Sequence, residues 1–363
     1  MKIKDFQYNE NFQFSLSRYL YRVAYNTIKM IEHRLRNLVI SGYGNKLKKD
    51  KDLIKIISKE NNKVMRISPD TLEQVIITGE CSITSGFVRL LIANGVDLVF
   101  IGRNPGLFAR VMRGDHNFIT DLWRMQMLMS NDKKLEIAKA IIDSTIYNKI
   151  RLLQNLAKNY GAGIDISEGV AALNKHRQNI RGAGNIDVLM GYEGDSTRRY
   201  FELLRKFLPH DYGFEKRTKH PPLDPVNSML SYGYTVLKSR CDYGLFLAGL
   251  NAYEGVLHGV YRNRSALGFD LMEEFRQPIV DRVVITMIAR KQINKGDFEF
   301  TAKGCFIDGD GKKLFLDLLY HRFEREYEYY GEKLSFLDII FEQAKRLANA
   351  IRGDAKYVGF KYR

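Results

Sequence analysis

The pattern of apolar residues changes once along this chain, near residue 113, and that change limits the folds open to it. Between residues 37 and 113, short β-branched runs such as NLVISGYG, LEQVIIT and VDLVFIG alternate with clusters of Gly, Pro, Asn and Lys. Such runs are typical of β-strands joined by tight turns. One helix is predicted among them over SGFVRLLIANG, with Ser82 or Thr84 as N-cap and Gly95 at its end.

After residue 113 nearly every segment has the apolar spacing of an amphipathic helix. Helices are predicted over DLWRMQMLM, KLEIAKAIIDSTIYNKIRLLQNLAKN, GYEGDSTRRYFELLRKFL, NSMLSYGYTVLKSRCDYGLFLAGL, EGVLHGVYRNRSALGFDLMEEFRQPIVDR and LSFLDIIFEQAKRLANAIRG. The exception is DFEFTAKGCFIDGDGKK, whose alternation, ending in a Gly-Asp-Gly turn, predicts a small hairpin. The final YVGFKYR is expected to be a mobile end.

The sequence therefore predicts an α+β fold in two domains. A β-rich N-terminal domain covers residues 37–113, and a larger, mainly α-helical catalytic domain covers 114–363. Residues 1–36 form an N-terminal amphipathic helical extension, which is expected to dock on the body of the protein.

The charge balance indicates a polyanionic partner. Lys and Arg number 57 against 42 Asp and Glu, a net charge of +15, which favours nucleic acid but leaves ribosomal and membrane-surface roles open. Cys81, Cys241 and Cys305 are far apart and predict neither a disulfide framework nor a zinc knuckle. There is no apolar signal core and no long apolar run, so we expect no membrane contact and a cytoplasmic location.

Several acids and one histidine lie among apolar residues in the helical half. Asp270, Glu273 and Glu274 share one side of a helix, and His258 precedes Asp270 by twelve residues across a segment able to turn. Glu193 lies between Gly191 and Gly194, which together leave room for a backbone or a ligand to approach.

Together Glu193, His258 and Glu273 would supply two carboxylates and an imidazole, a set that suits Mg²⁺ or Mn²⁺ with open positions for water and phosphate. Taken singly, each acid is as well explained by a solvated helix face, and His258 by an ordinary structural role. Arginines near these groups are candidate DNA-phosphate contacts, or else ordinary helix ion pairs: Arg198, Arg217, Arg262, Arg264 and Arg276.

The segments GYEGDSTRRYF, DPVNSMLSYGYTVL and LHGVYRNRSALGFDLMEEFRQPIVDR resemble, in this order, the signature blocks of a known family. It is the first-numbered CRISPR-associated protein (Cas-one), the spacer-acquisition integrase. The resemblance covers about residues 37–363 and includes LEQVIITGECSITSGFVRLLIANGVDLVFIG in the first half.

The resemblance implies a homodimer that uses Mg²⁺ or Mn²⁺ held by Glu193, His258 and Glu273. It gives Asp270 a supporting role, lets Asn227 and Tyr232 shape the site, and makes Arg217 and Arg264 the first candidates for phosphate contact. Ala266 replaces a frequent serine of the family, and residues 1–36 have no counterpart in it.

By the same resemblance, the chain is a metal-dependent DNA endonuclease and integrase of antiviral adaptive immunity. The 3′-hydroxyl of a prespacer attacks a phosphodiester of a CRISPR repeat, and a small partner (Cas-two) bridges two dimers. Two alternatives stay open. One is a transposon-encoded casposase, which the short C-terminal end makes less favoured, and the other is a DNA-binding assembly subunit without catalysis.

Overall fold

A computed structural model describes residues 37–40, 44–59, 63–72, 74–77, 80–101, 108–111, 118–160, 163–219, 221–259 and 265–363. Two compact units divide the chain, Met1–Asn117 and Phe118–Arg363. The predicted extension over residues 1–36 lies outside the described residues, as do Arg262 and Arg264. In the part of the chain that is described, no helix combines the length and apolarity that a bilayer span requires.

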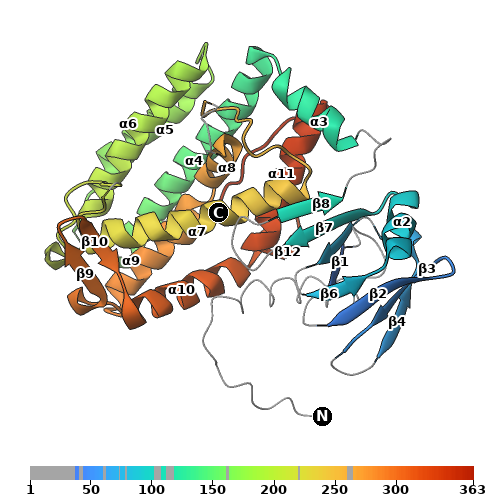
Figure 1. The fold of residues 1–363 in the computed structure, drawn as a ribbon. Helices are drawn as coiled ribbons and strands as arrows, with labels where there is room; N and C mark the ends of the chain where they lie inside the picture. Colours follow the sequence, from blue (N-terminus) through green and yellow to red (C-terminus); the bar gives the residue numbers. More distant parts are fainter. Residues whose placement is uncertain are drawn as a thin grey trace. The chain divides into compact units, whose positions relative to one another are not determined.

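The first unit holds two four-stranded sheets, with strand orders β1-β5-β7-β8 and β4-β3-β2-β6 (Figure 1). In the first sheet β1, β5 and β7 run parallel and β8 is antiparallel; in the second, β2 is antiparallel to β3 and parallel to β6. The strands are β1 Asn37–Ile40, β2 Asn45–Asp50, β3 Leu53–Ile57, β4 Val64–Ile67, β5 Gln74–Ile77, β6 Cys81–Ile83, β7 Asp97–Ile101 and β8 Phe108–Val111. Between β6 and β7 lies α2, Ser85–Ala93.

Sequence reasoning predicted six of these strands and the helix correctly. The Thr84 hydroxyl accepts a hydrogen bond from the Phe87 N–H at 3.2 Å, and Gly95 adopts a φ of 68°, as a helix end requires. Sequence reasoning missed β6 and the lysine-rich β2, in which only Leu47 is buried. Backbone pairing with a strand on each side holds β2 in place, and its side-chain pattern gives little sign of that.

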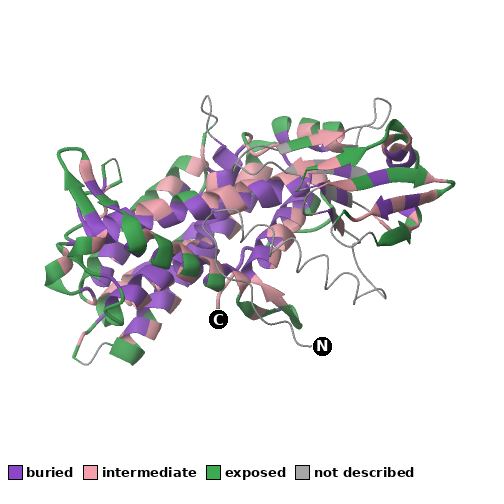
Figure 2. Cartoon of the chain, turned by 60° about the horizontal axis from the view of Figure 1, so that its bottom comes forward, coloured by how far each residue is buried: buried purple, intermediate pink, exposed green. Residues whose placement is uncertain are grey.

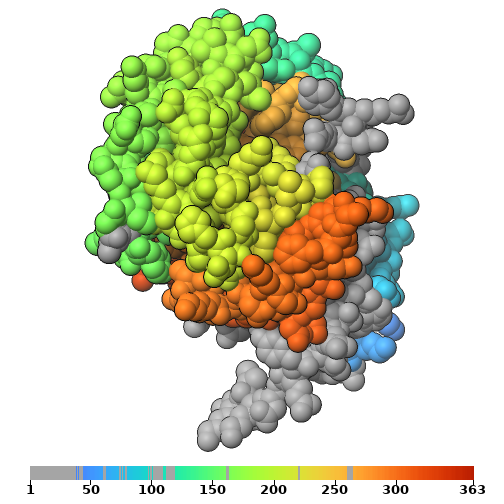
Figure 3. Space-filling model, turned by 90° about the vertical axis from the view of Figure 1, so that its left-hand side faces the viewer, coloured from blue at the N-terminus to red at the C-terminus, as the bar shows by residue number. Residues whose placement is uncertain are grey.

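The second unit is mainly helical, and buried residues line the inner faces of its helices (Figure 2). The helices are α3 Phe118–Met127, α4 Asn131–Tyr160, α5 Ser167–Ile180, α6 Ile186–Arg205, α7 Pro225–Leu247, α8 Ala266–Glu273, α9 Arg282–Ala289, α10 Gly309–Glu324 and α11 Phe336–Arg352. Two hairpins complete it, β9 Phe298–Thr301 with β10 Gly304–Ile307, and β11 Glu326–Tyr329 with β12 Glu332–Ser335. Helix α4 packs against α5, α6 and α8, and α7 packs against α8 and α11. Figure 3 shows a face on which α5, α6, the segment before α7 and the β9–β10 hairpin reach the surface together.

The structure corrects several predictions for this half. The long helix expected over residues 254–282 begins only at Ala266, and Arg276–Asp281 forms a π-helical turn around Pro278, which lacks the N–H that a regular helix needs. The β9–β10 hairpin is confirmed, but the Gly-Asp-Gly run belongs to the start of α10. Sequence reasoning missed α5, α10 and the β11–β12 hairpin.

The C-terminal tail is anchored, which corrects the expectation of a mobile end. Tyr357 and Phe360 are buried, and the Phe360 ring stacks on Phe275 with centroids 5.1 Å apart. The Asn148 side chain on α4 donates to the Phe360 carbonyl at 2.9 Å and accepts from the Tyr362 N–H at 2.8 Å. The tail is therefore part of the packing beneath the acid-bearing helix α8.

Candidate active site

The three predicted ligands come from separate elements and face a common region. Glu193 lies on α6, Glu273 ends α8, and His258 lies in the loop before α8. His258 lowers the pKa of both acids, and Glu193 raises that of Glu273, so each group lies within the electrostatic reach of the others. Segments far apart in the sequence thus bring two carboxylates and an imidazole within electrostatic reach of one another.

Asp270 holds His258 in a defined orientation. This carboxylate is fully buried on α8 and accepts backbone N–H bonds from Val256, Leu257 and His258 at 2.7, 3.1 and 3.0 Å. The same carboxylate lies 2.6 Å from Nδ1 of the His258 ring. When Nδ1 donates to Asp270, Nε2 carries the lone pair that a metal or a proton can use.

The charge of Asp270 also keeps the imidazole basic. Burial works to lower the pKa of His258, but the hydrogen bond and charge of Asp270, together with Glu273, raise that pKa above its ordinary value.

Glu273 is a buried acid with one bound and one unsatisfied oxygen. Its Oε1 lies 2.7 Å from Nη2 of Arg276, one helical turn later. Its Oε2 is buried and has no hydrogen-bond partner among the described residues. Burial, and to a smaller extent the charge of Glu193, raise the pKa of Glu273 against the opposing charge of Arg276. A buried carboxylate oxygen without a partner is costly unless something else binds it.

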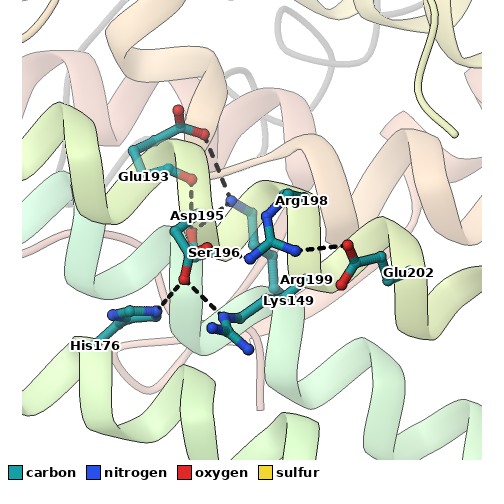
Figure 4. Close-up of polar contacts among 8 residues, drawn as sticks. All are labelled: Lys149, His176, Glu193, Asp195, Ser196, Arg198, Arg199 and Glu202. Atoms are coloured by element: carbon teal, nitrogen blue, oxygen red, sulfur yellow. Dashed lines mark hydrogen bonds and ion pairs between the residues drawn. The ribbon is translucent and has the colours of Figure 1, made fainter.

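Glu193 is held from two sides. The Thr197 hydroxyl, one turn later on α6, donates to Glu193 Oε1 at 2.6 Å. The Lys149 ammonium reaches from α4 to within 3.6 Å of the same oxygen (Figure 4). Burial works to raise the pKa of Glu193, but Lys149, Thr197 and Arg276 outweigh it and hold that pKa below its ordinary value. Glu193 is therefore an ionised carboxylate, and Lys149 is a site residue that sequence reasoning missed.

The start of α7 builds a second layer of the site. Asn227, fully buried, accepts from Arg217 Nη1 at 2.8 Å and donates to the Lys216 carbonyl at 2.8 Å, so it fixes the loop before α7. The Tyr234 ring lies between two guanidinium groups, with Arg217 Cζ and Arg276 Cζ at 5.5 and 5.0 Å from its centroid. Its hydroxyl donates to the buried Asp281 carboxylate at 2.5 Å.

The tyrosine predicted to shape the site lies elsewhere. Tyr232 contacts Phe315 and Lys312 of α10, with its ring centroid 6.2 Å from Phe315. Side chains two positions apart on a helix point in nearly opposite directions, so Tyr232 and Tyr234 lie on different sides of α7. Tyr234 is the tyrosine beside the site.

The predicted phosphate-binding arginines are all engaged within the chain where the structure describes them. Arg198 is held by Asp195 and Glu202 at 2.6 and 2.7 Å, as Figure 4 shows. Arg217 is bonded to Asn227 and to Ser231, the latter at 3.0 Å, and Arg276 to Glu273. The charge of Arg276 reaches both Glu193 and Glu273, but a phosphate has to share the donors of all three arginines with these partners.

The third clustered acid serves the fold. The Glu274 carboxylate points away from the site and accepts hydrogen bonds from Gln343, Tyr357 and the Phe360 N–H, each at 2.8 Å. Burial raises the pKa of Glu274 to about 7. The three acids at helical spacing therefore divide between the His258 loop, the site and the tail.

Gly191 and Gly194 leave open space beside Glu193. A Cβ built on either glycine meets no atom of the described chain within 4 Å. The described part of the chain brings no backbone of another segment close to either glycine, so the room is open to a ligand or to a partner.

The donor set suits a divalent cation, but the ligands are not arranged around one. In the ranges that the structure describes, no three His, Cys, Asp or Glu side chains are grouped closely enough to hold a metal ion. Glu193 instead contacts Lys149 and Glu273 contacts Arg276. The unsatisfied Glu273 oxygen and the fixed His258 ring are the features that fit a cation.

A β-rich unit is followed in this chain by a helical unit that holds two acids and a histidine within electrostatic reach of one another. A family model described as CRISPR associated protein Cas1 matches residues 38–320. The CRISPR-associated endonuclease Cas1 1 of Archaeoglobus fulgidus is 34% identical over 89% of this chain and 98% of its own length. The chain belongs to the Cas1 family of CRISPR-associated endonucleases, as the sequence resemblance predicted.

Solved structures agree on the fold. A chain of a structure described as a partial Cas6-RT-Cas1–Cas2 complex has a TM-score of 0.70 and 26% identity, and the match covers 91% of this chain and all of the other. A casposase bound to its integration product has a TM-score of 0.78, with 90% and 99% of the two chains covered. Its identity is 22%, so this likeness concerns the fold alone.

Proposed function

We propose that this protein joins the 3′-hydroxyl end of a short DNA duplex to a phosphodiester of a CRISPR repeat, and that it does so with Mg²⁺ or Mn²⁺ held by Glu193, His258 and Glu273. The observation that supports it best is the buried Glu273 oxygen without a hydrogen-bond partner among the described residues, on the same helix as the Asp270 carboxylate that orients the His258 ring. Membership of a family whose relatives are named endonucleases supports the class of reaction.

In this reaction the 3′-oxygen of the fragment bonds to phosphorus and the bond from phosphorus to the 3′-oxygen of the target strand breaks. The attacking hydroxyl gives up a proton and the departing oxygen takes one up. A bound divalent cation supplies charge stabilisation for both oxygens. The chain's own residues hold the geometry: Asp270 fixes the ring of His258, and Asn227 fixes the loop that carries Arg217.

The cationic surroundings suit a phosphate substrate. Lys219 of the same loop lies within electrostatic reach of Glu193, Glu273, Arg217 and Arg276. Positive groups around a carboxylate site offset its negative field and hold phosphates without reading base sequence. We also propose a homodimer that assembles with a Cas2 protein on DNA and acts in the cytoplasm; the Cas1–Cas2 complex among the solved neighbours supports the choice of partner.

The test incubates the purified protein with Mn²⁺, a labelled duplex with free 3′-hydroxyls, and supercoiled plasmids with and without a CRISPR repeat. We expect label to join the repeat plasmid, and joining to vanish with Glu193→Ala, His258→Ala or Glu273→Ala. Matched controls are Glu168→Ala and His210→Ala, which remove an exposed acid at the start of α5 and an exposed histidine after α6, and which should leave joining intact. Joining that survives all three site substitutions contradicts the proposal.

Two further readouts separate the alternatives. A non-catalytic DNA-binding subunit would bind DNA without forming any joined product, whereas we expect Glu193→Ala protein to bind DNA as wild type does and to lose only the chemistry. Equal joining to both plasmids would favour a casposase-like choice of target.

A further inference from the structure

Lys149 is a cation buried at the site, on the side of Glu193 that faces α4. Its side chain is 2% exposed, in the middle of a 30-residue helix that packs against α6. The ammonium donates to the Thr197 hydroxyl at 2.5 Å and to the Ser196 hydroxyl at 3.1 Å, and lies 3.6 Å from Glu193 Oε1. Two hydrogen bonds and one ion pair therefore hold the ammonium in place.

The contacts form a closed arrangement around Glu193. The Thr197 hydroxyl that accepts from Lys149 donates its own hydrogen to Glu193 Oε1, and the Ser196 hydroxyl donates to the Glu193 carbonyl at 2.8 Å. Figure 4 shows the ammonium between the Glu193 carboxylate and the Ser196 side chain. Lys149 therefore holds the backbone and the carboxylate of this turn of α6 together.

Each of the two carboxylates already has a cation beside it. Lys149 lies 3.6 Å from Glu193 and Arg276 lies 2.7 Å from Glu273, and each cation is within electrostatic reach of both acids. A divalent cation adds two further positive charges next to Lys149 and Arg276. It must bind beside a buried ammonium that cannot move into water, and repulsion between like charges is strong in such surroundings.

We propose that Lys149 is a positioning residue that serves as the counter-cation of Glu193. In the protein without DNA, Lys149 weakens the binding of a divalent cation, and this effect is offset when a DNA phosphate binds. The phosphate brings the negative charge that the loaded site lacks. Metal and DNA then strengthen each other's binding, and by thermodynamic linkage the factor is the same in both directions. This inference rests on the metal site of the proposed function.

The experiment measures Mn²⁺ binding by the intact protein, using the electron paramagnetic resonance signal of free Mn²⁺. Lys149→Gln removes the charge and keeps an amide that can bond Ser196 and Thr197; Lys149→Arg keeps the charge. Lys158→Gln is the matched control, because it removes an exposed lysine from the same helix. We expect Lys149→Gln to bind Mn²⁺ at least about tenfold more tightly than wild type, and the other two to stay within about threefold of it.

A second readout is thermal unfolding. In EDTA the Lys149→Gln protein should melt below wild type, and Mn²⁺ should raise its Tm by more than it raises that of wild type. A purely structural lysine would instead lower the Tm equally with and without metal and leave the Mn²⁺ affinity unchanged. That result overturns the inference.

The design also covers a variant that does not fold. If Lys149→Gln is insoluble without metal, the double variant Lys149→Gln/Glu193→Gln, which removes acid and base together, should fold; a double variant that also fails overturns the inference. Equal Mn²⁺ affinity of Lys149→Gln and wild type would contradict the inference about Lys149 and leave the proposed metal site standing. Absence of Mn²⁺ binding to any of the proteins would remove the proposed metal site as well.

Discussion

Replacing Asp270 with asparagine tests how the imidazole is oriented. The carboxylate accepts three backbone N–H bonds and the Nδ1–H of His258, whereas an asparagine side chain accepts at one position and donates at the other. With its NH₂ toward Val256 and Leu257, two backbone donors lose their acceptor. With its NH₂ toward His258, one backbone donor loses it, and the ring adapts by accepting at Nδ1. The second placement costs less and is the one we expect.

The magnitude follows from that placement. One buried N–H left without an acceptor costs about 1–3 kcal/mol, so the free energy of unfolding should fall by that amount and the protein should stay folded. The ring proton moves to Nε2, which can then no longer act as a ligand. Changes in groups that orient a metal ligand typically cost 10–100-fold in affinity or activity, so we expect DNA joining to fall by about that factor.

Two assays check the Asp270→Asn protein. Urea denaturation gives the loss of stability, and the ring ¹⁵N shifts of His258 report which nitrogen carries the proton. Asp187→Asn, an exposed acid in the first turn of α6, is the control and should change neither. Joining at the wild-type rate by an Asp270→Asn protein whose ring proton has moved to Nε2 would refute the reasoning.

Four further outcomes are expected. Gly233→Ala places a Cβ 2.5 Å from Val280 Cγ1 and should lower the free energy of unfolding by about 1–3 kcal/mol in a urea titration. In Gly191→Ala the added Cβ has no atom of another segment within 4 Å, so the better helix former should raise the free energy of unfolding by up to about 1 kcal/mol. A loss of DNA binding in the same protein would show that DNA fills the space beside Gly191. Phe360→Ala should cost about 3–5 kcal/mol, since the tail is packed and not mobile. Burial works to raise the pKa of Asp143, but Lys361 and Arg177 hold it below its ordinary value. The unfolded chain therefore binds the proton more readily than the folded one, and the stability advantage of wild type over Asp143→Asn, about 1 kcal/mol at neutral pH, should be lost as the pH falls below about 4.

The sequence predicted much of the fold because its local signals agree with the final packing. The strands of the first unit have β-branched runs between turn residues, and Thr84 and Gly95 are ordinary helix boundaries. It failed where tertiary contacts decide. The strand β2 is stabilised by its neighbours and not by its own side chains, and Pro278 turns a helical pattern into a π-helical turn.

The sequence pointed to the candidate ligands and not to their surroundings. His258 and Glu273 stand out as polar groups among apolar residues and Glu193 by its flanking glycines, and the structure places the three within electrostatic reach of one another. Lys149 gave no such signal, because a lysine in an amphipathic helix is nearly always exposed unless it is paired. The sequence also offered no reason to consider Tyr234, because α7 is buried on most sides and its residues show no polar stripe that would mark the face toward the site.

The central claim is that three side chains from separate segments bind one divalent cation. Crystals grown with Mn²⁺ and a short DNA duplex, with data collected near the manganese absorption edge, measure this directly. We predict one anomalous peak within about 2.5 Å of a carboxylate oxygen of Glu193, of Nε2 of His258 and of the Glu273 oxygen that now lacks a partner. A peak bound by other residues, or none beside these three in protein that joins DNA, would contradict it.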